Sequence, residues 1–222
     1  MTANAELIQA VAQAETQQIE LAKRVIVRDE PPFDGLLVTG IDVAYTDTDA
    51  LGCAVVMNLY SQTVVQIEKR TCECRTPYMQ GFFQLREGPV TAAILGRLKS
   101  TGPILINGNG VLHPRRLGLA SYLGVTMDKQ TIGITKTLLQ GKIQPRSGDT
   151  AEIVDVGLTV GSAMWRNDKK RPVYVSVGHR ISLETALEVV RATSVHGFPE
   201  PLRRAHSIAK SMAGTLHGGS VC

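Results

Sequence analysis

The chain has 222 residues, of which 43% are hydrophobic and 20% are charged, with a formal net charge of +4. This composition is that of a folded globular protein and excludes an intrinsically disordered chain. No apolar run reaches the roughly 18 residues of a membrane span. The N-terminus also has no basic region followed by a hydrophobic stretch. We therefore expect a cytoplasmic protein with no membrane partner, folded as one domain over residues 1–222.

The cysteines indicate the same compartment. Cys53, Cys72, Cys74 and Cys222 are expected to be free thiols in a reducing environment. Cys72 and Cys74 are too close in sequence for a zinc-ribbon pair, and no second pair of ligands follows at the required spacing. A structural zinc site is therefore not expected.

Residues 5–25 carry apolar side chains at helical spacing, which predicts an N-terminal amphipathic helix. Pro31, Pro32 and Gly35 then interrupt the pattern. Short polar turns separate three strand candidates, at residues 36–45, 51–60 and 63–69. Short turns of this kind favour an antiparallel meander.

The second part of the chain alternates between strand and helix patterns. In chain order we expect a loop at 75–81, a helix at 90–98, a buried strand at 104–106, a Gly-rich loop at 107–118 with a short helix after it, strands at 131–135, near 151–165 and at 172–178, helices from about 182 and after Pro201, and a flexible tail at 214–222. These elements predict an α/β fold in which helices cover both faces of a mixed β-sheet. Ligands in such sheets bind at the carboxyl ends of the central strands.

Three polar residues stand out against this pattern. Asp42 lies inside a hydrophobic strand, where a carboxylate is costly to bury without a partner. The alternative is an aspartate on the solvated face of an edge strand. Glu87 begins a helix, a position that the helix dipole favours for any acid. Asn107 ends the buried strand and opens a glycine-rich loop that continues to His113 and the pair Arg115-Arg116. That loop is either an anion site or an ordinary turn.

Several motifs in a fixed order resemble the endonuclease V family, which repairs or turns over nucleic acid containing deaminated adenine. The resemblance covers about residues 36–210. It is carried by Gly40-Ile41-Asp42-Val43-Ala44-Tyr45, Pro77-Tyr78-Met79-Gln80-Gly81, Arg86-Glu87-Gly88-Pro89, His113-Pro114-Arg115-Arg116-Leu117-Gly118-Leu119-Ala120-Ser121, Thr131-Ile132-Gly133-Ile134-Thr135-Lys136, Gly178-His179-Arg180 and Pro199-Glu200-Pro201.

The resemblance implies an RNase H-like fold and a Mg²⁺-dependent endonuclease, with Mn²⁺ as a substitute. The substrate implied is DNA or RNA that contains deoxyinosine or inosine, nicked at the second phosphodiester bond 3′ to the deaminated base. Asp42, Glu87 and Asn107 match the family's metal ligands, because hard Mg²⁺ prefers oxygen donors. Lys136 and His179 match auxiliary catalytic residues near the phosphate. Taken alone, Lys136 would be a surface lysine and His179 a structural histidine.

The resemblance also implies a nucleic-acid surface. Tyr78 would wedge into the duplex beside the damaged base, which swings out of the stack into a pocket. The matching nucleic-acid-binding residues are Pro77, Tyr78, Met79, Gln80, Gly81, Gly108, His113, Arg115 and Arg116. In the family the backbone at the positions of Gly81 and Gly108 lines the pocket. Without the resemblance, Tyr78 would be interpreted as a surface tyrosine in a turn.

Two departures from the family pattern affect this prediction. The usual Asp-Gly-His-Gly segment is Asn107-Gly108-Asn109-Gly110 here, which removes one negative charge from the metal site. Losing that charge is expected to slow cleavage roughly 100-fold or more. Gln80 replaces the second proline of the wedge loop, which leaves that loop less rigid.

Three explanations of the change at Asn107 remain open at this point: a weak or inactive relative, an active enzyme with a rearranged ligand set, and a deliberate substitution. The corresponding functions are a nuclease, a protein that binds deaminated bases without cutting, and, as a third hypothesis, an RNase H-like protein with a structural role. No protein partner is inferred.

Overall fold

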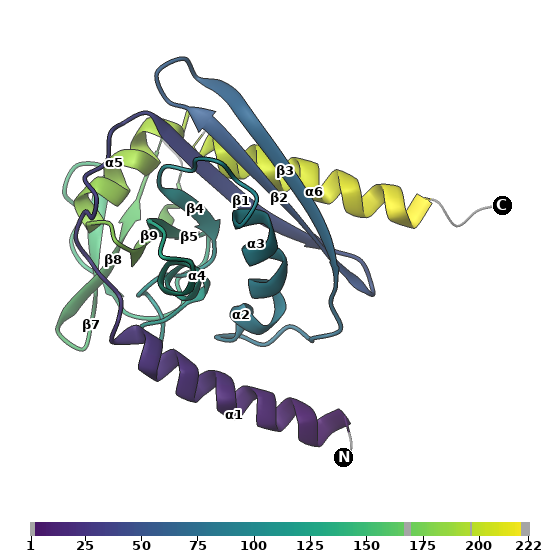
Figure 1. Cartoon of the computed structure of the whole chain (residues 1–222). Coiled ribbons are helices and arrows are strands. Elements are labelled where there is room, and N and C mark those ends of the chain that lie inside the picture. The colour runs from purple at the N-terminus through teal and green to yellow at the C-terminus, as the bar shows by residue number, and fades with distance from the viewer. Residues whose placement is uncertain (1–2, 167–169, 196, 219–222) are drawn as a thin grey trace.

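The computed structural model describes residues 3–166, 170–195 and 197–218. Its elements in chain order are α1 (Ala3–Ala22), β1 (Leu37–Tyr45), β2 (Asp49–Asn58), β3 (Thr63–Glu73), α2 (Phe83–Arg86), α3 (Gly88–Leu95), β4 (Ile104–Asn107), α4 (Leu119–Met127), β5 (Thr131–Thr135), β6 (Lys142–Ile143), β7 (Thr150–Asp155), β8 (Leu158–Met164), β9 (Val173–His179), α5 (Leu183–Thr193) and α6 (Glu200–Gly218) (Figure 1).

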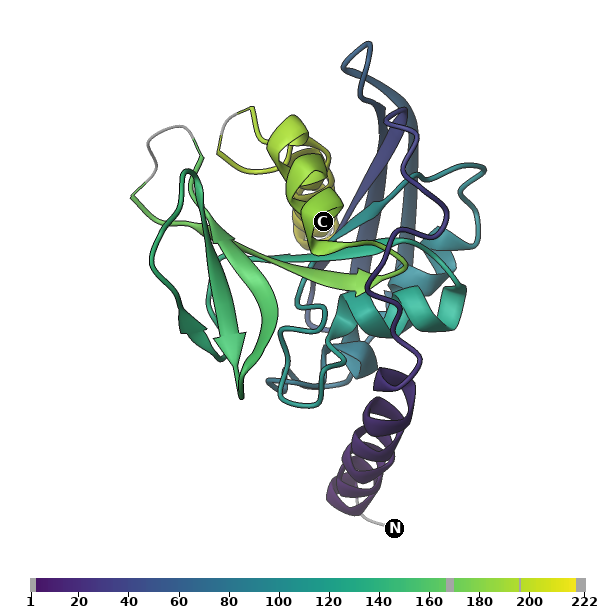
Figure 2. The same cartoon turned by 90° about the vertical axis from the view of Figure 1, so that its left-hand side faces the viewer.

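One nine-stranded mixed sheet organises the molecule, in the order β3-β2-β1-β4-β5-β9-β8-β7-β6. The first three strands form the predicted antiparallel meander. β4 is parallel to both β1 and β5, so the carboxyl ends of these three strands meet at one edge. Strands β6 to β8 extend from the central sheet as a separate wing (Figure 2). The predicted mixed sheet is confirmed.

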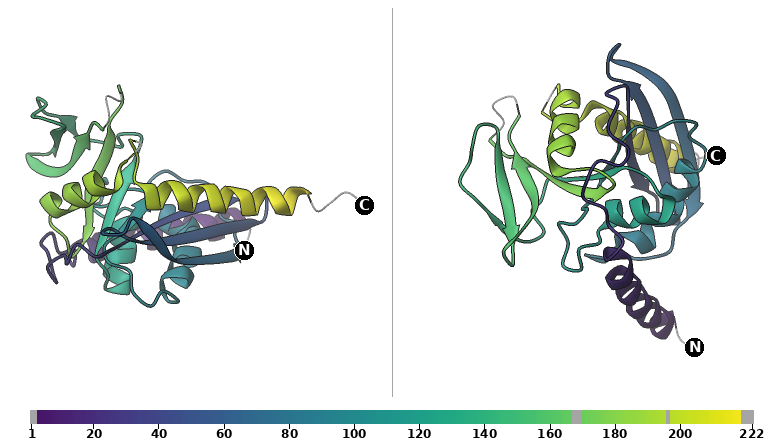
Figure 3. Two further views of the ribbon diagram at one scale, coloured as in Figure 1. Left: turned by 90° about the horizontal axis from the view of Figure 1, so that it is seen from above. Right: turned by 60° about the vertical axis from the view of Figure 1, so that its left-hand side comes forward.

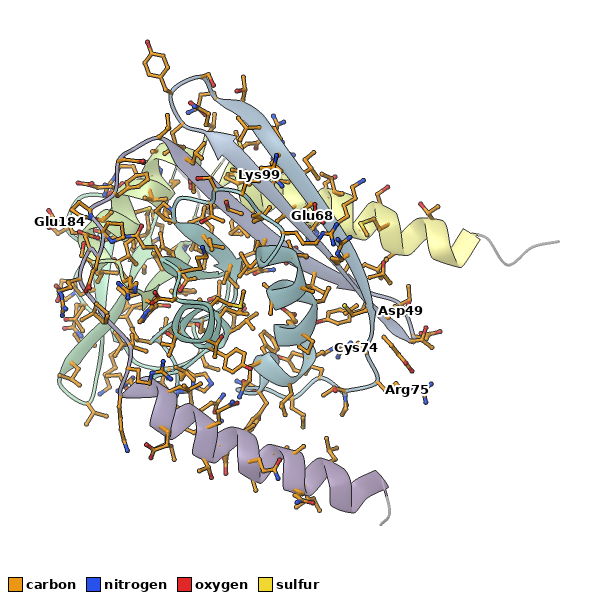
Figure 4. The ribbon with its side chains drawn as sticks, viewed as in Figure 1. Asp49, Glu68, Cys74, Arg75, Lys99 and Glu184 are labelled. Atoms are coloured by element: carbon orange, nitrogen blue, oxygen red, sulfur yellow. The ribbon has the colours of Figure 1, made fainter. Side chains whose placement is uncertain are left out.

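Helices cover both faces of the sheet. Seen from above, α6 lies on one side of β1 and β2, and α3 and α4 lie on the other (Figure 3). Neighbouring residues of β1 point to opposite faces, as the two-residue period of a strand requires. Val38 packs in the core with α5 and α6, whereas Ile41 packs in the core with α3 and α4. On the second face, Arg97 follows α3 and contacts Glu68 of β3 at 3.0 Å (Figure 4 labels Glu68).

Gly40 allows α6 to lie unusually close to β1. A Cβ atom at Gly40 would be 2.3 Å from the carbonyl carbon of Pro201 and 2.4 Å from the amide nitrogen of Leu202. Real Cβ atoms do not approach backbone atoms this closely, so only glycine fits while α6 keeps its place. Asp42 lies two residues further along β1 and therefore faces α6 as well. The close approach thus brings the first turns of α6 to the carboxylate.

Replacing this glycine is expected to destabilise the protein. Gly40→Ala must push α6 off β1, and overpacking of this kind costs about 1–3 kcal/mol of the free energy of unfolding. Urea denaturation followed by circular dichroism measures the loss. Gly214→Ala is the matched control, since Gly214 is an exposed residue near the end of α6 and a Cβ atom added there would meet nothing within 4 Å. That variant is expected to be stabilised by up to about 1 kcal/mol. Equal stability of Gly40→Ala and the unaltered protein would contradict the close-approach argument.

Two predicted elements differ from the structure, and one strand was not predicted. α1 ends at Ala22, and its apolar residues Ile8 and Ile19 are 64% and 51% exposed rather than buried. The helix instead buries Ala14 and the polar Gln18. β6 was not predicted, because it is two exposed residues long and has no periodic pattern. α6 continues to Gly218, so the first part of the predicted flexible tail is helical, and residues 219–222 lie outside the described residues.

The described residues contain no helix that is both long enough and apolar enough to cross a membrane. Cys53, Cys72 and Cys74 are free thiols, and the prediction for Cys222 falls on a residue outside the described ranges.

Candidate active site

Asp42 and Asn107 meet at the carboxyl ends of two parallel strands. Ile41 of β1 pairs in register with Ile106 of β4, so the next residue of each strand lies beside the other. Asp42 is only 6% exposed. Its Oδ1 accepts a hydrogen bond from Nδ2 of Asn107 at 2.9 Å. The amide group therefore partly satisfies a buried carboxylate that would otherwise be costly.

His206 is a site residue that the sequence analysis missed. It lies on α6, and its Nδ1 is 2.6 Å from the second oxygen of Asp42, Oδ2. This contact depends on the close packing of α6 against Gly40. His206 follows Leu202 by four residues and therefore shares its side of the helix. That spacing was available from the sequence, but a histidine in an amphipathic helix carries no signal that distinguishes it from a surface residue.

Glu87 approaches Asp42 from the face of the sheet that α3 covers, opposite to the face that α6 covers. It is the residue just before α3, and its Oε1 accepts a hydrogen bond from the hydroxyl of Tyr45 at 2.9 Å. Burial raises the pKa of Glu87 to about 7; the Tyr45 hydrogen bond opposes this increase, and the charge of Asp42 adds to it. Burial also raises the pKa of Tyr45, so its hydroxyl stays protonated and donates.

Tyr45 is itself held by the chain around Glu87. The guanidinium carbon of Arg86 lies 3.9 Å from the centre of the Tyr45 ring. The carbonyl of Arg86 accepts a weak hydrogen bond from the thiol of Cys74 at 3.7 Å, near the end of β3 (Figure 4 labels Cys74). The carboxylate of Glu87 is thus fixed by contacts from β1 and from the segment after β3.

These polar residues open into one pocket of about 430 Å³. Its lining residues are Asp42, Val43, Tyr78, Gln80, Gly81, Phe83, Gln84, Glu87, Asn107, Gly108, Asn109, His113, Gly118, Leu119, Thr135, Lys136, Thr137, Leu138, Leu139, Phe198, Leu202 and His206. Lys136 directly follows β5, and its Nζ lies 4.7 Å from the centre of the Phe198 ring. The structure therefore brings Asp42, Glu87, Asn107 and Lys136 to one cavity.

A loop held by several hydrogen bonds forms another part of the pocket wall. Gly81 has a φ of +82°, a conformation that favours glycine. Its carbonyl oxygen lies 3.1 Å from Nε2 of His113 and accepts from Nη2 of Arg115 at 3.3 Å. Because Nδ1 of His113 accepts from the amide of Arg115, Nε2 carries the proton and donates to Gly81. Burial, with the charge of Arg115 adding to it, lowers the pKa of His113 to about 4, so this histidine is neutral at pH 7.

The predicted wedge residues divide between the pocket and its surroundings. Tyr78 is 62% exposed, and its ring packs edge-on against Phe83 with the centroids 5.3 Å apart. Tyr78 and Gln80 line the pocket, whereas Pro77 and Met79 do not.

Arg115 and Arg116 were predicted to bind nucleic acid, but both are engaged within the protein. Arg115 contacts Glu15 of α1 at 3.2 Å as well as the Gly81 carbonyl. Arg116 pairs with Asp155 of β7 at 2.6 Å. Neither arginine lines the pocket. Their geometry is that of residues that hold the Gly81 loop and the β7 wing in place, and their direct contact with nucleic acid stays a prediction.

His179 was predicted to act near the phosphate, and the structure places it elsewhere. It pairs in register with Thr131, the first residue of β5, whereas Asn107 pairs with Ile134 near the other end of that strand. His179 is 4% exposed, and its Nδ1 accepts a hydrogen bond from the amide of Ile26 at 3.2 Å. It is therefore a buried structural histidine at the other end of β5 from Asn107, which corrects the prediction.

Within residues 3–166, 170–195 and 197–218, no group of three or more His, Cys, Asp or Glu side chains is arranged to hold a metal ion. Asp42 and Glu87 are acids of the predicted metal set, and the amide of Asn107 occupies the remaining position.

A mixed sheet with Asp42 and Asn107 at the carboxyl ends of two adjacent central strands is consistent with an RNase H-like α/β fold. The chain belongs to the Endonuclease V family, whose family model matches residues 19–207. It is 37% identical to the Endonuclease V of Thermofilum pendens over 207 residues, which cover 92% of this chain and 89% of that relative.

Solved structures of the family agree with this assignment. The Endonuclease V of Streptomyces avermitilis superimposes with a TM-score of 0.85 at 34% identity, covering 93% of this chain and 94% of that one. A Ciona intestinalis Endonuclease V superimposes with a TM-score of 0.86 at 25% identity, covering 94% of this chain and 99% of that one. That structure is a complex with a 24mer DNA containing an inosine followed by a ribo-adenosine.

Proposed function

We propose that this protein is a Mg²⁺-dependent endonuclease that nicks inosine- or deoxyinosine-containing nucleic acid at the second phosphodiester bond 3′ to the deaminated base. The observation that carries the proposal is the convergence of Asp42, Glu87 and Lys136 on one pocket beside the Gly81 loop. The inosine-containing DNA bound by the Ciona intestinalis relative supports the choice of substrate.

The donor set fits a hard divalent cation. Glu87 has a buried carboxylate whose pKa is raised to about 7, and no basic side chain in the described part of the chain forms an ion pair with it. Asp42 lies near enough for its charge to raise that pKa further. Two carboxylates, together with the amide oxygen of Asn107, are the kind of ligands that Mg²⁺ accepts, with substrate phosphate completing the shell. Mn²⁺ fits the same donors.

When bound, the metal ion would polarise the scissile phosphate and make a bound water more acidic. The protein's own residues orient the substrate and balance the negative charge of its phosphates. Lys136, held over Phe198, supplies a positive charge on the pocket wall where the phosphate backbone would pass. His206 fixes the orientation of Asp42 through its 2.6 Å contact and carries a second nitrogen that can exchange a proton with substrate.

A second function is favoured by one observation. The amide of Asn107 donates a hydrogen bond to Asp42. An aspartate at position 107 would instead repel Asp42, and the two carboxylates together would attract a cation. A protein with this arrangement would bind nucleic acid that contains deaminated bases and cut it slowly or not at all.

Cleavage of a labelled duplex with a single deoxyinosine, in Mg²⁺ and separately in Mn²⁺, tests the two functions. A nick one nucleotide beyond the lesion supports the endonuclease. A mobility shift that is selective for deoxyinosine, without a nick, supports the binding protein. A duplex with adenine at the same position is the control. Absence of both cleavage and selective binding would overturn both functions.

Tyr78 gives a prediction for binding. Tyr78→Ala is expected to weaken binding of the deoxyinosine duplex about 10-fold or more, because a stacked aromatic ring contributes about 1–3 kcal/mol per base. Fluorescence anisotropy in Ca²⁺ measures the dissociation constant without cleavage. Tyr60→Ala is the matched control, since Tyr60 is 94% exposed in the turn between β2 and β3. Similar losses in both variants would contradict a wedge role for Tyr78.

A further inference from the structure

Two glutamine side chains meet in the interior beside the pocket. Gln18 of α1 is 0% exposed and Gln84 of α2 is 4% exposed. Nε2 of Gln18 donates to Oε1 of Gln84 at 2.8 Å and to the carbonyl of Gly81 at 2.8 Å. Nε of Arg115 donates to Oε1 of Gln18. Every hydrogen-bonding atom of the Gln18 amide therefore has a partner.

The neighbours of this pair fix which way each amide faces. The guanidinium of Arg115 can only donate, so it requires the oxygen of Gln18. The Gly81 carbonyl can only accept, so it requires the nitrogen of Gln18. That nitrogen in turn requires the oxygen of Gln84. The orientation of the Gln84 amide is thus determined by one group that can only donate and one that can only accept. Its Nε2 must therefore point away from Gln18.

Nε2 of Gln84 is left without a partner. It is buried, and no hydrogen-bond acceptor for it exists among the described residues. Buried donors in folded proteins are nearly always paired, and an unpaired one needs an explanation. Gln84 lines the same pocket as Asp42 and Glu87. A ligand atom that enters the pocket beside Gln84 is the partner that this donor lacks.

At each of the two positions expected to line the base pocket, one backbone group is already engaged. The amide of Gly108 donates to the carbonyl of Ile134 at 3.0 Å. The carbonyl of Gly81 receives hydrogen bonds from Gln18, His113 and Arg115. Gln84 offers an additional, side-chain donor at this wall of the pocket.

We propose that Gln84 is a specificity-determining residue that donates a hydrogen bond from Nε2 to the 6-oxygen of a purine in the pocket, and that Gln18 is a positioning residue that holds it in this orientation. Hypoxanthine carries an acceptor at that position, whereas adenine carries an amino donor that would face another donor. Gln84 thus selects 6-oxopurines against adenine. The inference rests on the proposed function, because it assumes that a base enters this pocket.

The test measures binding of three duplexes that differ only in the target base: hypoxanthine, adenine and unsubstituted purine, which is hypoxanthine without its 6-oxygen. Gln84→Leu is expected to reduce the preference for hypoxanthine over adenine about tenfold, the effect of one lost hydrogen bond. Binding of the purine duplex is expected to change less than twofold, because that base has no 6-oxygen to lose. Gln18→Leu is expected to reduce the preference by a smaller factor, since Gln84 can then turn.

The controls separate recognition from folding. Thr16→Ala changes an exposed residue of α1 whose hydroxyl bonds only within the helix, and it is expected to keep the full preference. If Gln84→Leu does not fold by circular dichroism, Gln84→Met gives the same comparison with an unbranched side chain. An unchanged preference, or equal weakening for all three bases, would overturn the role of Gln84. If the unaltered protein itself shows no preference for hypoxanthine, the proposed function fails, and the inference fails with it.

Discussion

An Asn107→Asp variant is expected to nick deoxyinosine DNA in Mg²⁺ at least about 100-fold faster than the unaltered protein, which corresponds to about 2.8 kcal/mol of the activation free energy. The substitution replaces the hydrogen bond from Asn107 to Asp42 with two facing carboxylates. Their mutual repulsion is relieved by a cation between them, so the variant should also bind Mg²⁺ and Mn²⁺ more tightly. Single-turnover cleavage rates and calorimetric titration with Mn²⁺ measure the two effects.

Asn58→Asp is the matched control for the added charge. Asn58 lies at the end of β2, and its Oδ1 accepts hydrogen bonds from the amides of Tyr60 and Ser61, a role that aspartate can also fill. Its cleavage rate should equal that of the unaltered protein. If Asn107→Asp cuts no faster than this control, the residue at position 107 does not limit the reaction.

Glu87→Gln is expected to abolish cleavage and, in the absence of metal, to raise stability at pH 8. The pKa of Glu87 is raised from 4.5 to about 7 in the folded protein. The folded state therefore holds an extra proton between these values, and stability falls as the pH rises through 7. Since one pKa unit corresponds to about 1.36 kcal/mol, the cost at pH 8 is on the order of 3 kcal/mol. A glutamine stays neutral and avoids this cost.

Denaturation in EDTA at pH 5 and pH 8 measures this effect. The Glu87→Gln variant should be clearly more stable than the unaltered protein at pH 8, with most of the difference gone at pH 5. Glu152→Gln, which changes an exposed carboxylate on β7, should show no such pH dependence. A Glu87→Gln variant that is less stable at pH 8 would mean that burial does not penalise this carboxylate.

Much of the central sheet could be predicted because its signals are local. The polar turns between the first strands indicated the meander, and the continuous apolar run at residues 104–106 indicated a strand buried on both faces. Asp42 and Asn107 were assigned to one site by the family resemblance, and the parallel pairing of β1 with β4 brings them together at one edge. Glu87 came from the family resemblance, since a helix-start acid has no distinguishing local pattern.

The remaining site residues depend on packing between distant segments. His206 reaches Asp42 only because Gly40 lets α6 approach β1, and no sequence pattern at Gly40 or His206 predicts this contact. Gln18 occupies a polar position of an amphipathic pattern, yet it is fully buried, because its partners come from the Gly81 loop and from Arg115. The error at His179 has the same origin: a motif match gives a residue's order along the chain but not the end of the strand at which it lies.

The attachment of α1 has a practical consequence for labelling. Gln18 anchors the carboxyl-terminal half of this helix beside the pocket, while the other end of α1 extends away from the body (Figure 2). At 1.5 Å per residue, Ala3 lies roughly 20 Å along the helix axis from Gln18. A fluorophore or surface tether placed on that first turn would leave the pocket entrance clear. Its emission would still report on an acceptor-labelled duplex that arrives there, because energy transfer is sensitive over such a span.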